Sequence, residues 1–143
     1  MKTSVAARRL IEEFEGFRAT PYRCPAGVPS IGFGHAIKKG EKFTRLTLRE
    51  GEALLVKDLE PVESAIDWLV TAPLAQNQYD ALASLVYNIG SKQFGESTLL
   101  TLLNAEDYAQ AAGQFARWVK SGEKTLPGLV KRRAAEAKLF VTK

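Results

Sequence analysis

The chain has 143 residues, of which 45% are hydrophobic and 25% charged, a balance typical of a globular protein with one core. Its 20 basic and 16 acidic residues give a net charge of +4, which favours an anionic partner, but no basic run interleaved with aromatic residues indicates nucleic acid. The single cysteine excludes an internal disulfide, and no apolar run approaches the roughly 20 residues that span a bilayer. We therefore expect no stable membrane insertion, and synthesis in the cytoplasm without a signal peptide.

Residues 3 to about 14 are predicted to form a short amphipathic helix, because their apolar positions recur at helical spacing and Thr3 or Ser4 can cap it. Glu15 then stands at the helix end, before Gly16 and between two phenylalanines. An apolar setting disfavours a charged carboxyl, so Glu15 is suited to give up a proton near neutral pH. From these residues alone, an exposed surface carboxylate is the alternative.

The segment from Phe17 to about Ile37 predicts a small twisted antiparallel sheet, because short apolar stretches alternate with glycines and turns. It contains the only cysteine, Cys24, the hydroxyl of Ser30 and the only histidine, His35. We interpret His35 as a structural hydrogen-bonding residue in preference to a catalytic one.

The rest of the chain is predicted to be helical. A long helix over about 47 to 70 begins at a capping box of Thr47 and Glu50, and its length suits a connector between two lobes with a cleft beside it. Pro61 predicts a kink or a restart within it. Further segments are a core helix over 75–89, helices over 97–103 and about 105–119, a polar loop over 120–125 and a last helix over 127–141.

Details of these last segments are also predicted. Asn104 is expected to cap the helix over about 105–119, and Trp118 to pack in the core. Pro127 is expected at the first position of the last helix. Its inward residues are predicted to be apolar, namely Leu129, Val130, Ala134, Ala137 and Phe140.

Three separated motifs resemble the phage-type lysozymes (endolysins) of glycoside hydrolase family 24. The first runs from Glu15-Gly16 through Tyr22-Arg23-Cys24-Pro25 to Ile31-Gly32-Phe33-Gly34-His35. The others are Gln76-Asn77-Gln78-Tyr79-Asp80-Ala81-Leu82 with Tyr87-Asn88-Ile89-Gly90, and Gly128-Leu129-Val130-Lys131-Arg132-Arg133. The family pattern has a catalytic Glu, an Asp or Cys nine positions on and a Thr six beyond that. This sequence matches it with Glu15 and Cys24, and Ser30 stands in place of Thr.

The resemblance implies a predominantly helical α+β fold of the lysozyme type, with two lobes, a small antiparallel sheet and a long connecting helix. It implies a single domain over 1–143, in which the small lobe covers about 12–50 and the helical lobe covers about 60–143 with the N-terminal helix. The implied activity is hydrolysis of the β-1,4 bond between N-acetylmuramic acid and N-acetylglucosamine in peptidoglycan. Glu15, Cys24 and Ser30 are the implied catalytic residues, with no cofactor and no metal. The expected protein is a monomer that reaches the cell wall after release through a holin.

Two other functions remain open at this stage. One is a peptidoglycan amidase or peptidase with Cys24 as nucleophile and His35 as base. The other is an inactive wall-binding module of the same fold.

The last helix carries a further prediction. The resemblance suggests that it packs near Glu15, and Arg132 and Arg133 are separated by about 100° around a helix axis. We therefore predict that one of the two arginines pairs with Glu15 or lines the cleft, while the other faces solvent.

Overall fold

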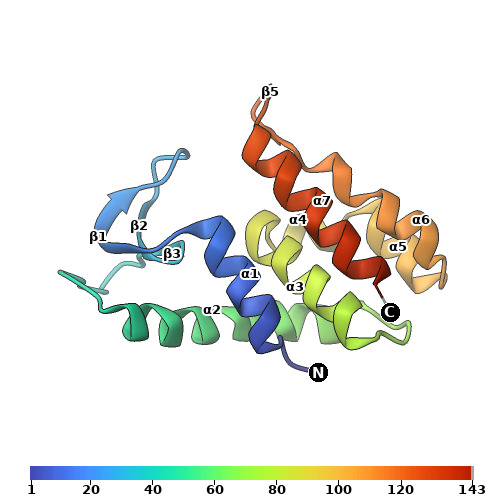
Figure 1. Ribbon diagram of the computed structural model, residues 1–143, viewed down its shortest axis with the longest axis horizontal. Helices are drawn as coiled ribbons and strands as arrows, with labels where there is room; N and C mark the ends of the chain where they lie inside the picture. The colour runs from blue at the N-terminus through green and yellow to red at the C-terminus, as the bar shows by residue number, and fades with distance from the viewer. Residues whose placement is uncertain (143) are drawn as a thin grey trace.

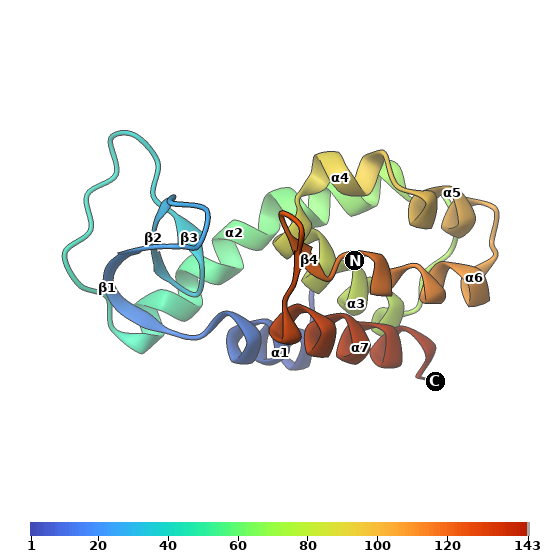
Figure 2. The same cartoon turned by 90° about the horizontal axis from the view of Figure 1, so that it is seen from above.

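The computed structural model describes residues 1–142, and helices account for most of them (Figure 1). The sheet lies at one end of the molecule, most of the helices lie at the other, and α2 runs between the two ends (Figures 1 and 2). The elements are α1 Val5–Glu15, β1 Arg18–Arg23, β2 Pro29–Gly32, β3 His35–Ala36, α2 Leu48–Leu69, α3 Gln76–Ile89, α4 Ser91–Gly95, α5 Thr98–Asn104, α6 Tyr108–Gly113, a 3₁₀ turn η1 Phe115–Arg117, β4 Lys120–Ser121, β5 Lys124–Thr125 and α7 Pro127–Val141.

The predicted antiparallel sheet is confirmed, with strand order β1-β2-β3. Tyr22 is paired with Ser30 across β1 and β2, and the register shifts between Arg18 and Tyr22. A loop then leads from β3 to α2, and the backbone N–H of Leu46 in this loop donates to the carbonyl of Ala19 on β1. We call residues 17–47 the sheet lobe and the remaining described residues the helical lobe.

The long helix α2 begins as predicted, at a capping box in which Thr47 and Glu50 bond each other's backbone N–H. The predicted restart at Pro61 is wrong, because α2 continues without interruption from Leu48 to Leu69. Pro61 is exposed, so water can satisfy the carbonyl that loses its helical partner there. One continuous helix, α2, therefore leads from the sheet lobe into the helical lobe.

The core centres on α3, in which every residue from Tyr79 to Val86 is buried. Helices α1, α2 and α7 pack on α3, and α4 to α6 close the far side (Figure 2). Apolar side chains from all of these helices form one cluster, including Ile11, Leu55, Leu82, Phe94 and Phe140. Trp118 packs partly buried against this cluster, as predicted.

Two predicted boundaries in the C-terminal half are wrong. The helix expected over about 105–119 is the short helix α6 followed by η1, and its cap is Asp107. Asn104 instead ends α5, and its side-chain amide joins the backbone of Thr71 and Leu69 after α2. The segment expected as a loop over 120–125 forms the two-stranded hairpin β4–β5.

The inward face of α7 also differs from the prediction. Val130 and Ala134 are exposed, whereas Arg132, Arg133 and Glu136 are buried. Pro127 does begin the helix at its first turn. No helix in residues 1–142 combines the length and the apolar character needed to cross a bilayer.

Candidate active site

Glu15 is the last residue of α1, and Gly16 ends the helix with a φ of +73°. The Glu15 side chain is 19% exposed. Its carboxylate lies directly against the backbone of Gly34, where an added Cβ atom would be 2.7 Å from Glu15 Oε1. Gly34 has a φ of +84°, so both the space and the backbone conformation require glycine there. The glycine between β2 and β3 thus lets the sheet lobe approach the carboxylate.

Arg132 of α7 fixes the other side of the Glu15 carboxylate. Its Nη1 donates to Glu15 Oε2 at 2.6 Å, its Nη2 donates to the Ser84 carbonyl, and its Nε donates to Glu136 Oε2. A guanidinium with all three nitrogens engaged is held in one orientation. The prediction that one of the two arginines pairs with Glu15 is therefore confirmed for Arg132.

The prediction that the other arginine faces solvent is wrong. The side chain of Arg133 is 1% exposed. It donates to Glu136 Oε1, to the Trp118 carbonyl and to Asn88 Oδ1. Consecutive arginines can both be buried here because Glu136, three and four positions on, lies between them and accepts from each.

Cys24 and Ser30 both lie in the β1–β2 hairpin. Cys24 directly follows β1 and is half-buried, and its backbone N–H donates to the Val28 carbonyl. Ser30 is buried in β2, and its hydroxyl donates to the same carbonyl of Val28 at 3.1 Å. Arg23, which could have activated the thiol, is exposed and donates to the Gly27 carbonyl instead.

A cavity of about 700 Å³ lies between the sheet lobe, the middle of α2 and the end of α3. Gly34, which lies against the Glu15 carboxylate, and Tyr87 are among the residues that line it. The Tyr87 hydroxyl donates to the Phe33 carbonyl at 2.8 Å, which ties α3 to the sheet lobe. Burial raises the pKa of Tyr87 well above its ordinary value, so the phenol stays protonated. The cavity is large enough for sugar rings, and Glu15 is connected to it through Gly34, whereas Glu15, Cys24 and Ser30 are not themselves among its lining residues.

The family model for phage lysozyme matches residues 12–136. The chain belongs to the phage lysozyme family. An endolysin of Acyrthosiphon pisum secondary endosymbiont phage 1 is 43% identical over 137 residues, covering 92% of each chain. The endolysin of Salmonella phage P22 is 43% identical over 132 residues, covering 90% of each chain.

Solved structures agree with the phage lysozyme assignment. The muramidase domain of SpmX from Asticaccaulis excentricus is 38% identical, with a TM-score of 0.90 over 99% of both chains. A P22 lysozyme mutant is also 38% identical, with a TM-score of 0.88 over 99% of both chains. The predicted lysozyme-like fold is therefore confirmed. This lysozyme is a glycosidase that hydrolyses peptidoglycan, and the amidase or peptidase alternative is not favoured.

His35 has the structural role predicted for it. Its Nδ1 lies 2.8 Å from an Asp58 carboxylate oxygen on α2, and its Nε2 lies 3.0 Å from Glu41 Oε1. Burial acts to lower the pKa of His35, but the hydrogen bonds with Glu41 and Asp58 outweigh it and raise the pKa above 6.5. His35 therefore joins β3, the following loop and α2 through both ring nitrogens. Neither ring nitrogen is directed to Cys24.

Several residues of this lysozyme's site were not anticipated from the sequence. Ser84 and Glu136 orient Arg132, and Tyr87 supports Gly34 through the neighbouring backbone. Tyr22 also stands at the site, because it is the cross-strand partner of Ser30. The one available signal was that Tyr22 and Tyr87 both lie inside the motifs that carry the family resemblance.

Proposed function

We propose that this lysozyme is a muramidase that hydrolyses the β-1,4 bond between N-acetylmuramic acid and N-acetylglucosamine. The observation that carries the proposal is the Glu15 carboxyl, held between Arg132 and the backbone of Gly34, a residue that lines the 700 Å³ cavity. A carboxyl fixed beside a sugar-sized cavity is what a glycosidase needs as its general acid. The names of the muramidase and endolysin relatives support the same assignment.

Glu15 acts as the general acid. As the bond between C1 and the glycosidic oxygen breaks, the Glu15 proton passes to that oxygen and the leaving sugar departs as an alcohol. A water molecule oriented by the Cys24 sulfur forms the new bond to C1, and its proton passes to solvent. A proton from solvent then restores the carboxylic acid of Glu15, so that one water is consumed in each cycle.

Arg132 sets a condition on this cycle. The guanidinium of Arg132 holds Glu15 Oε2 at 2.6 Å, whereas the reaction needs a proton on this carboxyl that is free to leave. Bound sugar at Gly34 must therefore move the carboxyl away from Arg132, because excluding water alone would strengthen the attraction. The ion pair holds Glu15 in place in the free enzyme, and substrate binding releases it for catalysis.

Ser30 assists the water. Because its hydroxyl hydrogen is directed to the Val28 carbonyl, Ser30 offers the water the lone pairs of its oxygen. Cys24 and Ser30 meet at this carbonyl, since the Cys24 backbone N–H bonds it as well. Both residues of the proposed water site are thus anchored to one backbone carbonyl of the hairpin.

The proposal is tested by the products of purified peptidoglycan. Each cut at the glycan bond should add the mass of one water and leave a reducing muramic acid end. A cut in the stem peptide, or a product without the added water, would contradict the proposal. Glu15→Gln, whose amide cannot donate the proton, should lose roughly 10²- to 10⁴-fold in turnover. Glu13→Gln removes a carboxylate from the exposed face of the same helix, so it should retain wild-type activity.

Three further expectations belong to the same proposal. The two lobes work as one lysozyme domain over 1–143, because the cavity is formed by both of them. The enzyme acts as a monomer on glycan strands, and it reaches the wall through a holin. Sedimentation in solution, and lysis of cells that express the chain with and without a holin, test the last two.

A further inference from the structure

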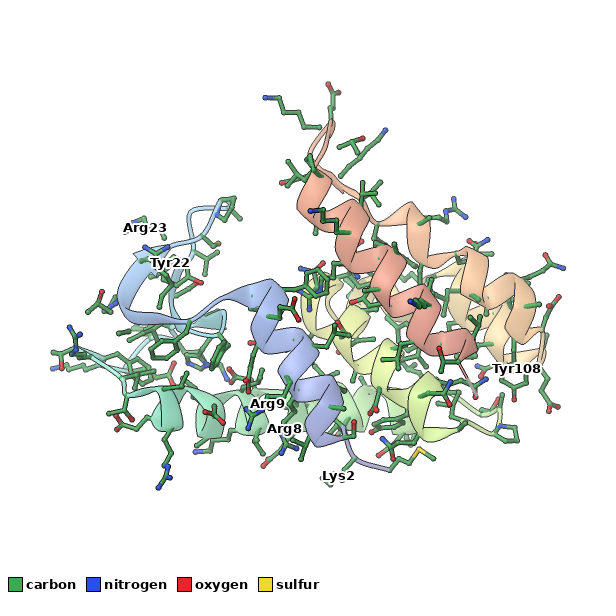
Figure 3. The ribbon with its side chains drawn as sticks, viewed as in Figure 1. Lys2, Arg8, Arg9, Tyr22, Arg23 and Tyr108 are labelled. Atoms are coloured by element: carbon green, nitrogen blue, oxygen red, sulfur yellow. The ribbon has the colours of Figure 1, made fainter. Side chains whose placement is uncertain are left out.

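The hydroxyl group of Tyr22 has no protein partner among residues 1–142, in contrast to those of the other three tyrosines. Tyr87 donates to the Phe33 carbonyl at 2.8 Å and Tyr108 to the Pro73 carbonyl at 2.7 Å. Tyr79 is directed to the Glu63 carbonyl at 3.5 Å. The Tyr22 side chain is half-buried on β1 beside Arg23 (Figure 3). A tyrosine hydroxyl that packs against protein normally finds a partner, so a free one at a site is available to a ligand.

Strand geometry places Tyr22 among the residues of the proposed water site. Tyr22 is the cross-strand partner of Ser30. Directly opposed residues have Cβ atoms about 4.5–5.5 Å apart on one face of the sheet. Cys24 directly follows the strand, two positions after Tyr22. The phenol therefore shares a face with Ser30 and is close along the chain to Cys24.

The surroundings of the ring hold it in place and keep it protonated. The guanidinium of Arg18 lies 4.4 Å from the ring centroid, which is a cation–π contact from the same strand. Burial raises the pKa of Tyr22, and the negative charge of Glu15 adds to this effect. The side chain thus stays a hydrogen-bond donor at neutral pH.

We propose that Tyr22 is a further catalytic residue, whose hydroxyl binds the attacking water beside Cys24 and Ser30. This inference rests on the proposed function. The water donates one hydrogen to Ser30 Oγ and the other to the Cys24 sulfur. One of its lone pairs accepts the Tyr22 hydrogen, and the other forms the bond to C1. Ser30 cannot supply that donor, because its own hydrogen is directed to Val28.

The first test is Tyr22→Phe, which removes the oxygen and keeps the ring on Arg18. We expect kcat to fall roughly 10- to 100-fold, because a hydrogen bond of the transition state is lost, while KM changes less than about twofold. The melting temperature should stay at the wild-type value, because no protein hydrogen bond is removed. The matched control is Tyr108→Phe, which removes a hydroxyl bonded to Pro73 on the helical lobe and should retain wild-type kcat.

The second test separates water binding from a purely structural role. When methanol is added, a glycosyl centre can take methanol instead of water and yield a methyl glycoside. If Tyr22 binds the water, Tyr22→Phe should raise the ratio of methyl glycoside to hydrolysis product at a fixed methanol concentration. Tyr108→Phe should leave this ratio unchanged. A Tyr22→Phe enzyme with the wild-type ratio would overturn the inference, whatever its kcat.

Different results would contradict the proposed function and the proposed role of Tyr22. If Glu15→Gln is inactive and the products carry the added water, the proposed function stands. Wild-type kcat in Tyr22→Phe would then reject the role of Tyr22 alone. If instead the products show a cut in the stem peptide, the proposed function itself fails, independently of Tyr22.

Discussion

The two lobes hold their charged residues in different ways. In the helical lobe, Arg132, Arg133 and Glu136 are buried together, and the two guanidinium groups keep their protons near neutral pH. In the sheet lobe, the buried titratable group is His35, which contacts Glu41 and Asp58. The guanidinium charges are therefore permanent, and that of Arg132 contacts Glu15, whereas the charge of His35 depends on pH.

We therefore expect the helical lobe to determine mainly the stability of the fold and the sheet lobe mainly the turnover of the enzyme. The helical lobe supplies most of the apolar core, and its Arg132 donates a hydrogen bond to Glu15. The sheet lobe contributes few residues to that core, but it supplies Cys24, Ser30 and Gly34. Substitutions in the arginine cluster should therefore change the free energy of unfolding first, and substitutions in the hairpin should change turnover first.

The largest effect is expected from Glu136→Gln. This substitution leaves two buried guanidinium groups without their shared carboxylate, and breaking a buried pair costs about 3–5 kcal/mol. Urea denaturation measures the loss. Glu123→Gln, on the exposed hairpin between β4 and β5, should stay within about 0.5 kcal/mol of wild type. Equal losses for the two variants would show that the cluster does not support the fold.

Hairpin substitutions should give the opposite pattern. Ser30→Ala should lower turnover roughly tenfold by removing an oxygen that accepts from the water, and Ser30→Thr should be tolerated. Stability should change little, because the Val28 carbonyl keeps the Cys24 backbone N–H as a donor. Kinetics and melting curves on the same samples separate the two effects. Wild-type turnover in Ser30→Ala would mean that the hydroxyl is incidental.

Two substitutions of Cys24 test the proposed water site further, because they should lower turnover by different amounts. Cys24→Asp, the other residue of the family pattern, should retain substantial activity. Cys24→Ala should lose roughly 10- to 100-fold more, because no polar side chain is left there to orient the water. The reverse order would favour a thiol nucleophile and contradict the proposed mechanism.

Sequence reasoning anticipated the parts of the molecule that depend on local rules. The capping box at Thr47 and the helix end at Gly16 each follow from a few adjacent residues, and both are confirmed. Arg133 was misplaced because charged residues are normally directed to solvent. Its burial depends on Asn88, Trp118 and Glu136, which only the tertiary fold brings together. The partners of His35 were unpredictable for the same reason.

The pH dependence of the sheet-lobe cluster can be measured with His35→Asn. Because the pKa of His35 is raised in the folded chain, the native state binds the proton more tightly than the unfolded state. The stabilisation is therefore complete below pH 6.5 and is lost as the pH rises through the folded pKa. We expect the free energy of unfolding of wild type to exceed that of His35→Asn by about 2 kcal/mol at low pH. This difference should shrink above neutral pH. A His35→Asn difference that is constant with pH would show that the imidazole is neutral.

The smallest effect concerns net charge. The sheet lobe carries six of the 20 basic residues but one of the 16 acidic residues, so its charge is +5 and the rest of the chain carries −1. Exposed charges attract an anionic polymer through a field that salt screens. Neutralising four exposed side chains of the loop after β3 should weaken binding to purified peptidoglycan about threefold at low salt, and the difference should vanish at high salt. The four changes are Lys38→Gln, Lys39→Gln, Lys42→Gln and Arg45→Gln.

The matched control removes the same charge from the helical lobe. Its four changes, all at exposed positions, are Lys92→Gln, Lys120→Gln, Lys124→Gln and Lys138→Gln. If the position of the charge matters, this control should bind more tightly than the sheet-lobe variant at every low salt concentration, although the two have the same net charge. Sedimentation of each variant with insoluble peptidoglycan gives the comparison directly. Equal binding by the two variants would mean that only the total charge of the chain acts on the wall.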